Sequence, residues 1–327
     1  MKFSKAVSTY RFSSASFVAA CLVGAMVPAA AFAEYPERRI RIVTPYDPGS
    51  MVDTTTRMIA EGLSEKLGQT VVVENRSGGM GIIAMNALLG APADGYTLLT
   101  DTPASAINPT LYNADYNPKT EIAPIAQLMR LPFVIAANPQ LNVKTAKELI
   151  ELAKQKPDEI NVGVAGTSTG LVGELFSIQN GIKMHSIPYK GAGAATMATL
   201  KGDTSVIFLD AANLAPHIND GKLNGLLVTG DARSPVLPQV QTAAEQGLEF
   251  DSATWFGLFA RADVPAEIQE KLNETIREVM ASPKLQSYLK TRGATASDMN
   301  AEQFRTFFHK EVDTWAQVIK QANIKVN

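Results

Sequence analysis

The sequence predicts an α/β fold in which two lobes are each built on a mainly parallel β-sheet flanked by helices. Short apolar runs of strand character alternate with longer runs of helical periodicity along most of the chain. The length of 327 residues is enough for two lobes of about 150 residues each. Because small molecules bind at the carboxyl ends of the strands in doubly wound sheets, we expect a ligand cleft between the lobes.

The first part of the chain alternates regularly between the two element types. We expect strands at 39–44, 71–74 and 96–100, and helices at 54–67 and 81–89.

A second series with the same alternation follows, and it ends in a proline-rich connection and a helical tail. We expect strands at 133–137, 160–164, 185–188, 205–209 and 225–229, helices at 146–155, 171–179, 194–201 and 214–220, and a long connection at 230–246. In the tail, apolar residues recur at spacings of three and four from Phe304 to Ile319, which predicts one amphipathic helix.

The N-terminus has the features of a cleaved secretory signal peptide. Three basic residues precede an apolar run at 17–27, and Ala31-Phe32-Ala33 forms a cleavage site of small residues before Glu34. The apolar run is too short for a membrane span. We therefore expect residues 1–33 to be removed and the mature chain to be periplasmic. A retained anchor, or lipidation at Cys21, is the open alternative.

Composition excludes several classes of function. Cleavage would remove the single cysteine, which leaves the mature chain without disulfide or thiol chemistry. It would also remove three cations and change the formal charge from −2 to −5, and this mild acidity without a basic patch argues against nucleic acid as a partner. No cluster of His, Asp and Glu shows metal-ligand spacing, so neither a metal nor a cofactor is expected.

Two turns share one design, in which a strand is followed by small and hydroxyl residues and then by a helix. They lie within 44–58 and 164–174. Asp53 is expected to be the N-cap of the first helix, and a hydroxyl group at 167–169 to cap the second. Backbone amides in such turns bind anions without a cationic side chain. Facing each other, the turns would hold a molecule with a carboxylate at each end, although both are also explained as well-capped helices.

Two catalytic motifs are the alternatives to a binding site. Gly166 to Gly170 reads Gly-Thr-Ser-Thr-Gly, which is the pattern of a nucleophile elbow and would make the protein a secreted α/β serine esterase that uses Ser168. None of the three histidines lies on an obvious catalytic loop, which disfavours the esterase. "GMGIIA" at 79–84, with Asp101 downstream, matches a dinucleotide-binding fingerprint, but 75–78 separates its glycines from the strand. A tight turn explains these glycines better.

Around the two turns the sequence resembles the extracytoplasmic solute receptors of tripartite tricarboxylate transporters, the Bug family. The resemblance covers nearly the whole mature chain, and as a set its motifs are specific. They are "YPERRIRIVTPYDPGSMVD", "LGQTVVVENRSGGMGIIA", "PADGYTLL", "AINPTLY", "IPYKGAGAA", "LAPHINDGKL", "RSPVLPQV" and "WFGLFA".

The resemblance implies a type II periplasmic-binding-protein fold that closes on a small carboxylate, in the manner of a Venus flytrap, and delivers it to membrane permease subunits. The ligand would be a di- or tricarboxylate or an aromatic carboxylate, and the receptor would be a monomer without enzymatic activity. Lobe 1 is expected at 34–132 and 256–327, and lobe 2 at 133–255. Closure is expected to bend the chain near 131–135 and 252–257.

Site residues are transferred from the family by position. They are Tyr46, Gly49, Ser50 and Asp53 of the first turn, Ala104 and Ser105, then Gly166, Thr167, Ser168 and Thr169 of the second turn, and Asp210.

Two residues depart from the family pattern in the first turn. Ser50 replaces a glycine and is expected to donate a side-chain hydrogen bond to the ligand. Asp47 replaces an apolar or small residue, so it is expected to face solvent or to bind a cationic group of the ligand.

Other side chains are candidates for the cleft wall or its mouth. Tyr46, Phe133 and Trp255 are expected to supply a flat apolar wall. Arg130 is either a solvated side chain or a counter-ion at the cleft mouth.

Overall fold

The computed structural model describes Met1 and residues 35–230 and 232–324. The chain divides into a unit of residues 1–37 and a unit of residues 38–327. The expected signal peptide, its cleavage site and Cys21 lie outside the described residues. No helix of the described residues combines the length and the apolar character needed to cross a membrane. All helices and strands described below lie in the second unit.

Lobe 1 is built on a sheet with the strand order β2-β1-β3-β9-β4, and β10 pairs with β4. The strand β1 is parallel to both of its neighbours, whereas β9 is antiparallel to β3 and β4. The strands are β1 (Ile40–Thr44), β2 (Val71–Asn75), β3 (Thr97–Asp101), β4 (Ile122–Ala137), β9 (Ala253–Arg261) and β10 (Thr295–Ala296). The helices that follow or flank them are α1 (Met51–Leu67), α2 (Ile82–Leu89), α3 (Ala104–Leu111), α8 (Ala266–Met280), α9 (Pro283–Lys290) and α10 (Ala301–Gln321), with the 3-10 turn η1 (Gly79–Gly81).

Lobe 2 is built on a sheet with the strand order β4-β7-β5-β6, and β8 pairs with β4. Here β5 is parallel to β6 and β7, whereas β4 is antiparallel to β7 and β8. The strands are β5 (Asn161–Val164), β6 (His185–Pro188), β7 (Val206–Asp210) and β8 (Asn224–Val228). The helices are α4 (Ala146–Gln155), α5 (Thr167–Asn180), α6 (Ala192–Lys201) and α7 (Ala211–Asn219), with the 3-10 turns η2 (Pro139–Leu141) and η3 (Ala244–Gln246).

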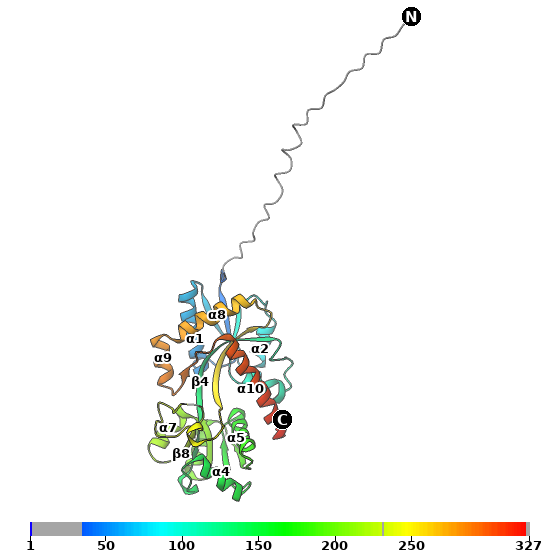
Figure 1. Cartoon of the computed structure of the whole chain (residues 1–327). Helices are drawn as coiled ribbons and strands as arrows, with labels where there is room; N and C mark the ends of the chain where they lie inside the picture. Colours follow the sequence, from blue (N-terminus) through cyan, green and yellow to red (C-terminus); the bar gives the residue numbers. More distant parts are fainter. Residues whose placement is uncertain (2–34, 231, 325–327) are drawn as a thin grey trace. The chain divides into compact units, whose positions relative to one another are not determined.

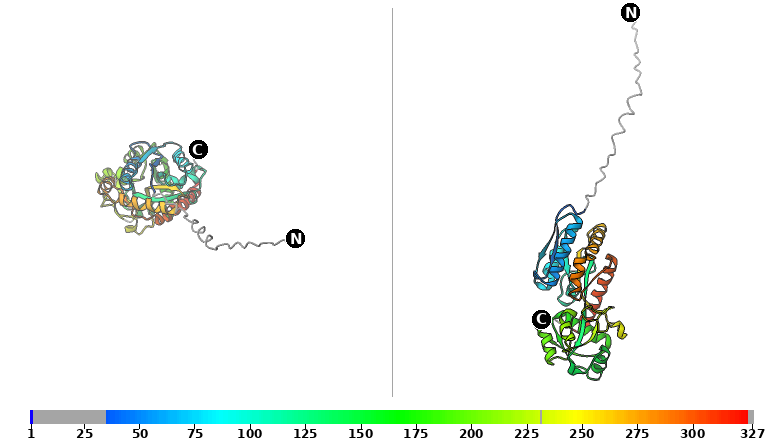
Figure 2. Two further views of the ribbon diagram at one scale, coloured as in Figure 1. Left: turned by 90° about the horizontal axis from the view of Figure 1, so that it is seen from above. Right: turned by 90° about the vertical axis from the view of Figure 1, so that its left-hand side faces the viewer.

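The two lobes share the long strand β4, which runs from one lobe into the other (Figure 1). Its residues 122–132 pair with β9, its residues 133–137 with β7, and its residues 134–137 with β8. The right-hand view of Figure 2 separates a lobe of blue and orange elements from a green lobe. The predicted α/β fold with two lobes is therefore confirmed, although the antiparallel pairs of β4 and β9 make both sheets mixed. The lobe boundaries stay a prediction.

The strand β4 is much longer than the strand expected at 133–137. Pro124 and Pro132 have no backbone amide to donate to a strand ladder. The sequence pattern therefore did not predict a strand in the first half of β4. The pairing with β9 tolerates Pro124 because its register shifts between Pro124 and Ala126. The helices α3, α8 and α9 and the strand β9 were also not predicted, because the expected alternation has no element at 101–132 and none between residue 246 and the helical tail.

The core of lobe 1 includes an aromatic cluster around Trp255. Its ring packs edge-on against Phe304, Phe307 and Phe308, with centroid distances of 5.8, 5.8 and 6.1 Å. Trp255 is fully buried, and its Nε1 donates to Glu311 at 2.9 Å. The expectation that Trp255 forms part of the ligand wall is wrong, because the apolar stripe of α10 covers this side chain.

The helix α10 connects the two lobes through packing. It contacts α3 and β4 and also α5 of lobe 2. Its buried residues follow the predicted stripe and are Phe304, Phe308, Trp315, Val318 and Ile319. The amphipathic helix expected at the tail is therefore present, and it begins after an Asn300–Gln303 capping box.

Replacing Gly257 by alanine is expected to destabilise this core. A Cβ atom at position 257 would lie 2.6 Å from the Phe304 ring and 3.0 Å from the Phe259 ring, both fully buried. We expect the free energy of unfolding to fall by about 1–3 kcal/mol, measured by urea denaturation. Gly173→Ala in α5 is the control, because its Cβ would meet Phe208 at 3.8 Å, an ordinary contact. Equal stabilities for the two variants would contradict the prediction.

Candidate functional site

Two adjoining hollows lie between the lobes. The first has a volume of about 420 Å³ and the second of about 270 Å³. Tyr46, Thr102, Ile107 and Ser168 line both, so the hollows form one continuous cleft. The first is also lined by Pro45, Asp47, Ser77, Gly78, Met80, Gly81, Ala104, Asn108, Tyr112 and Thr167. The second is also lined by Val52, Pro103, Phe133, Val172, Ala253, Thr254, Phe256 and Trp315.

The first hollow has three walls from lobe 1 and one from lobe 2. The lobe 1 walls are the turn after β1, the turn at η1, and the segment from the end of β3 through α3. The lobe 2 wall is the start of α5, at Thr167 and Ser168. Tyr112 Oη and Thr167 Oγ1 lie 3.5 Å apart, which is a hydrogen-bond contact between the lobes across the hollow.

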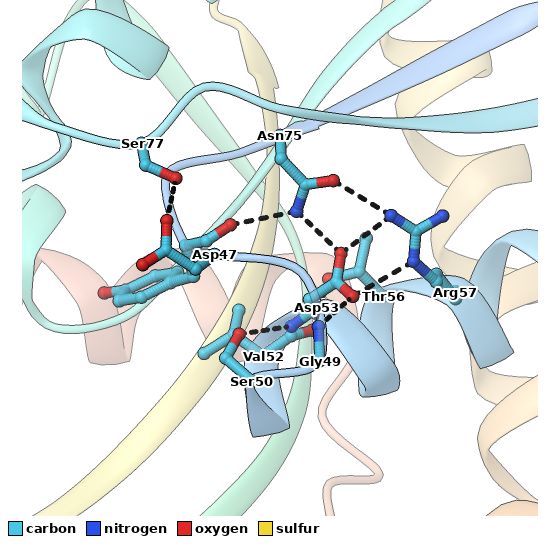
Figure 3. Close-up of polar contacts among 10 residues, drawn as sticks. Asp47, Gly49, Ser50, Val52, Asp53, Thr56, Arg57, Asn75 and Ser77 are labelled. Carbon is cyan, nitrogen blue, oxygen red and sulfur yellow. Dashed lines mark hydrogen bonds and ion pairs between the residues drawn. The ribbon is translucent and has the colours of Figure 1, made fainter.

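The turn after β1 is organised by the buried carboxylate of Asp53 (Figure 3). Asp53 accepts from the Gly49 amide at 2.9 Å, from Asn75 Nδ2 at 2.7 Å and from Arg57 Nε at 3.0 Å. Asn75 Nδ2 also donates to the Tyr46 carbonyl at 2.9 Å. Burial by itself raises the pKa of Asp53, but the hydrogen bonds from Arg57, Gly49 and Asn75 hold this pKa below its ordinary value.

The N-cap of α1 is Ser50, and the expectation that Asp53 caps this helix is wrong. Ser50 Oγ accepts from the Asp53 amide at 3.2 Å, while the Asp53 carboxylate reaches back to the Gly49 amide. Ser50 N donates to the Asp47 carbonyl at 3.2 Å. The amides of Gly49, Ser50 and Asp53 therefore have acceptors inside the turn.

The turn before α5 is open by comparison. Its N-cap is Gly166, whose φ of 140° suits glycine, and no side chain caps the helix amides. Thr169 Oγ1 instead accepts from the Ala165 amide and donates to the Gly166 carbonyl, both at 2.9 Å. The first amides of a helix have no acceptor within the helix, and here they belong to Thr167 and Ser168, which line the first hollow. Such a helix start binds anions.

Tyr46 and Thr102, which line both hollows, are hydrogen-bonded to the buried carboxyl group of Asp101. Tyr46 Oη lies 2.5 Å from Thr102 Oγ1 and 3.5 Å from Asp101 Oδ1, which also accepts from the Thr102 amide at 2.8 Å. Asp101 is almost completely buried, and burial raises its pKa to about 7 against the weaker effect of these hydrogen bonds. Burial, with the nearby Asp101, also raises the pKa of Tyr46 far above its ordinary value. A buried carboxyl group, whose protonated form is favoured by burial, therefore lies next to two side chains that line the cleft.

The glycine-rich segment at η1 is a tight turn and forms another wall of the first hollow. Gly78, Gly79, Met80 and Gly81 all have positive φ, between 55° and 106°. Asn108 Nδ2 donates to the Met80 carbonyl at 2.8 Å and holds the turn against α3. The interpretation of these glycines as a turn agrees with this geometry, and the sequence did not indicate their place in the cleft.

Four of the predicted site residues line the hollows, and seven lie outside them. Tyr46, Ala104, Thr167 and Ser168 line the first hollow. The other seven lie in the supporting turns and elements and are Gly49, Ser50, Asp53, Ser105, Gly166, Thr169 and Asp210.

Ser105 and Asp210 have defined structural contacts. Ser105 Oγ is buried and donates to the Thr102 carbonyl at 3.0 Å. Asp210 is the N-cap of α7, where its carboxylate accepts from the amide and the Nδ2 of Asn213. Their direct contact with a ligand stays a prediction.

The sequence did not single out several cleft residues, including Thr102, Asn108 and Tyr112. Their position in the chain is the one sequence feature that could have indicated them. Thr102 directly follows the carboxyl end of β3, where ligands bind in such sheets, and α3 begins two residues later. Arg130, by contrast, lines neither hollow. It pairs with Asp251 at 2.7 Å, and its guanidinium lies 5.7 Å from the centroid of Phe307.

Histidine, lysine and arginine side chains are absent from the described lining of the cleft. Within the described parts of the chain, no three His, Cys, Asp or Glu side chains are grouped as metal ligands. Ser168 therefore has no histidine beside it in the described cleft, whereas its helix start supplies backbone donors.

Comparisons with known proteins agree on one family. The family model described as "Tripartite tricarboxylate transporter family receptor" matches residues 55–324. Protein BugT of Bordetella pertussis is 32% identical over 298 residues, which cover 89% of this chain and 91% of that protein.

Two solved structures are similar over nearly the same span. R. palustris Rpa4515 with adipate is 31% identical, with a TM-score of 0.69, over 89% of this chain and 99% of that one. MatC from Rhodopseudomonas palustris with bound malate is 26% identical, with a TM-score of 0.66, over 87% of this chain and 100% of that one.

Removing the Asp53 carboxylate is expected to destabilise the turn after β1. Asp53→Ala leaves the Gly49 amide, the Asn75 amide and Arg57 without their shared acceptor. We expect the free energy of unfolding to fall by about 2–4 kcal/mol, measured by urea denaturation. Asp263→Ala removes a mostly exposed ion pair with Arg261 and should cost less than about 1 kcal/mol. Equal losses would show that the buried network contributes no more than a surface pair.

The buried Asp101 is expected to make stability depend on pH. The folded chain keeps a proton on Asp101 up to about pH 7, whereas the unfolded chain loses it near 3.8. Between these values the folded state binds more protons, so this group lowers the free energy of unfolding as the pH rises. In Asp101→Asn, the decline between about pH 4.5 and about pH 8 should be smaller than in the wild type by a difference on the order of 3 kcal/mol. Urea titrations at both pH values measure it, and parallel declines would contradict it.

Proposed function

The chain is a member of the receptor family of tripartite tricarboxylate transporters, the Bug proteins, and from this premise we propose that it is a periplasmic receptor for a small organic carboxylate. The ligand occupies the two hollows between the lobes, with a carboxylate at the start of α5. The observation that carries this proposal is the open turn before α5, whose first amides border a cleft without a cationic side chain among its described lining residues.

The shape of the cleft supports a ligand with a polar end and an apolar body. The second hollow is bordered largely by apolar side chains, including Val52, Phe133, Val172 and Phe256. Tyr46 and Phe133 still supply part of the flat wall expected from the sequence. The proteins solved with adipate and malate indicate that the fold holds aliphatic carboxylates. Aliphatic and aromatic carboxylates are both within the proposal.

The receptor passes its ligand to the permease subunits of a membrane transporter, acts as a monomer and has no enzymatic activity. Family membership supports the transporter partnership. Ligand binding brings the lobes together around the shared strand β4 and the start of β9, near residues 131–135 and 252–257. The esterase alternative needs a histidine next to Ser168, and no histidine lines the described cleft.

Ligand titration of the mature chain tests the proposal. Calorimetry with a panel of aliphatic and aromatic mono- and dicarboxylates should give binding for at least one member. Ser168→Ala should weaken the affinity for that member by about three- to ten-fold, since it removes one hydroxyl group beside the amides. Ser168→Glu should abolish binding, because it introduces a competing carboxylate at the anion site.

A serine outside the cleft provides the matched control. Ser287→Ala changes an exposed serine of α9 and should leave the affinity unchanged. If no carboxylate binds while the wild type hydrolyses an activated ester and Ser168→Ala does not, the chain is an esterase and the receptor proposal is wrong.

A further inference from the structure

Both tryptophans of the chain donate a hydrogen bond to the same carboxylate oxygen. Trp255 Nε1 lies 2.9 Å from Glu311 Oε2, and Trp315 Nε1 lies 3.1 Å from the same atom. Glu311 and Trp315 are four residues apart on α10, so they lie on one face of this helix. Trp255 belongs to the strand β9. A single oxygen atom therefore joins α10 to β9.

The two indole rings have different surroundings. Trp315 lines the second hollow of the cleft. Trp255 lines neither hollow and packs in the aromatic cluster described above. Its neighbours Thr254 and Phe256 do line the second hollow, since side chains alternate between the two faces of a strand. Both β9 and α10 thus contribute to the wall of the second hollow, and Glu311 connects the two contributions.

Glu311 itself is not part of the cleft. It lines a separate hollow of about 370 Å³, together with Phe307 and Thr314 of α10 and Asp251 of the chain before β9. None of the described residues of this separate hollow lines the cleft. Removal from water raises the pKa of Glu311, and the two indole donors oppose this effect. A desolvated carboxylate needs such donors, so the indole groups and Glu311 hold one another in place.

We propose that Glu311 is a positioning residue for ligand binding, which holds the Trp315 ring in the wall of the second hollow by anchoring it to β9. This role rests on the proposed function and adds to it a residue that sets the affinity from outside the cleft. Without the anchor, the Trp315 ring would lose its fixed orientation. A ligand would then have to order the ring when it binds, which lowers the affinity.

Calorimetry with a carboxylate panel that includes adipate, malate and benzoate tests this role. The acid that binds the wild type most tightly is the probe. Glu311→Ala removes the shared acceptor and should weaken the binding of the probe by about three- to ten-fold. Glu311→Gln keeps an acceptor oxygen on a side chain of the same length, so its affinity should stay within about two-fold of the wild type.

Glu302→Ala is the matched control. It removes an exposed carboxylate of the same helix, which pairs with Arg305 and lines neither the cleft nor the separate hollow. This variant should leave the affinity for the probe unchanged.

A double variant separates positioning from a merely structural effect. Trp315→Phe keeps an aromatic ring in the wall and removes its donor, so it should also weaken the binding of the probe. If Glu311 acts through Trp315, Glu311→Ala should cause no further loss of affinity in the Trp315→Phe background. A structural effect of Glu311 would cost the same in both backgrounds. Losses that multiply in the double variant would therefore overturn the proposal.

The indole groups provide a spectroscopic signature as well, because each tryptophan contributes one side-chain peak to a nitrogen–proton correlation spectrum. Saturation with the probe should shift both peaks in the wild type, although Trp255 lines neither hollow. In Trp315→Phe, the remaining Trp255 peak should no longer shift. This measurement decides the matter even if Glu311→Ala fails to fold. A Trp255 peak that still shifts as in the wild type would show that Glu311 does not link the two rings.

The outcomes for Glu311 and for the receptor function are distinct. If the probe binds and Glu311→Ala leaves its affinity unchanged, the positioning role is wrong while the receptor function stands. If no acid of the panel binds the wild type, the receptor function and the positioning role are both wrong.

Discussion

The buried carboxylate of Asp53 is the constraint on which the lobe 1 side of the cleft depends. A buried carboxylate needs several donors, and Asp53 takes them from the backbone of its own turn, from Arg57 and from Asn75. Because Asn75 is also bonded to the Tyr46 carbonyl, the same network fixes the segment that places Tyr46 at the boundary of the hollows. The same network therefore stabilises the turn and engages the Gly49 amide.

The shared strand β4 sets a different constraint, on how the lobes move. Since β4 is continuous through both sheets and α10 packs on elements of both lobes, relative movement has to be absorbed by a few residues of β4, by the chain before β9 and by the contacts of α10. Pro132 lies where the partners of β4 change from β9 to β7, and it lacks an amide for either ladder. The Tyr112–Thr167 contact joins the lobes on the cleft side.

The sequence predicted the parts of the molecule that local patterns encode. Alternation of strands and helices gave the first two series of elements, and the spacing of Phe304, Phe308 and Trp315 gave α10. Long-range pairing was not encoded locally, and so β9 and the first half of β4 were missed. In the site, the start of α5 was found because its turn is contiguous. The Tyr46–Thr102–Asp101 group joins two segments more than fifty residues apart, and no local pattern reports such a contact.

The segment from Gly166 to Gly170 shows why a motif alone did not decide between catalysis and binding. A nucleophile elbow and an anion site both need a sharp strand-to-helix turn with free backbone donors. Catalysis by a Ser–His pair further needs a histidine beside the serine, and no histidine lines the described cleft. The two turns of similar sequence also differ in their caps, because Ser50 and Asp53 accept from amides of the first turn whereas no side chain caps α5. The start of α5 therefore keeps its first amides for an anion, which favours binding over catalysis at Ser168.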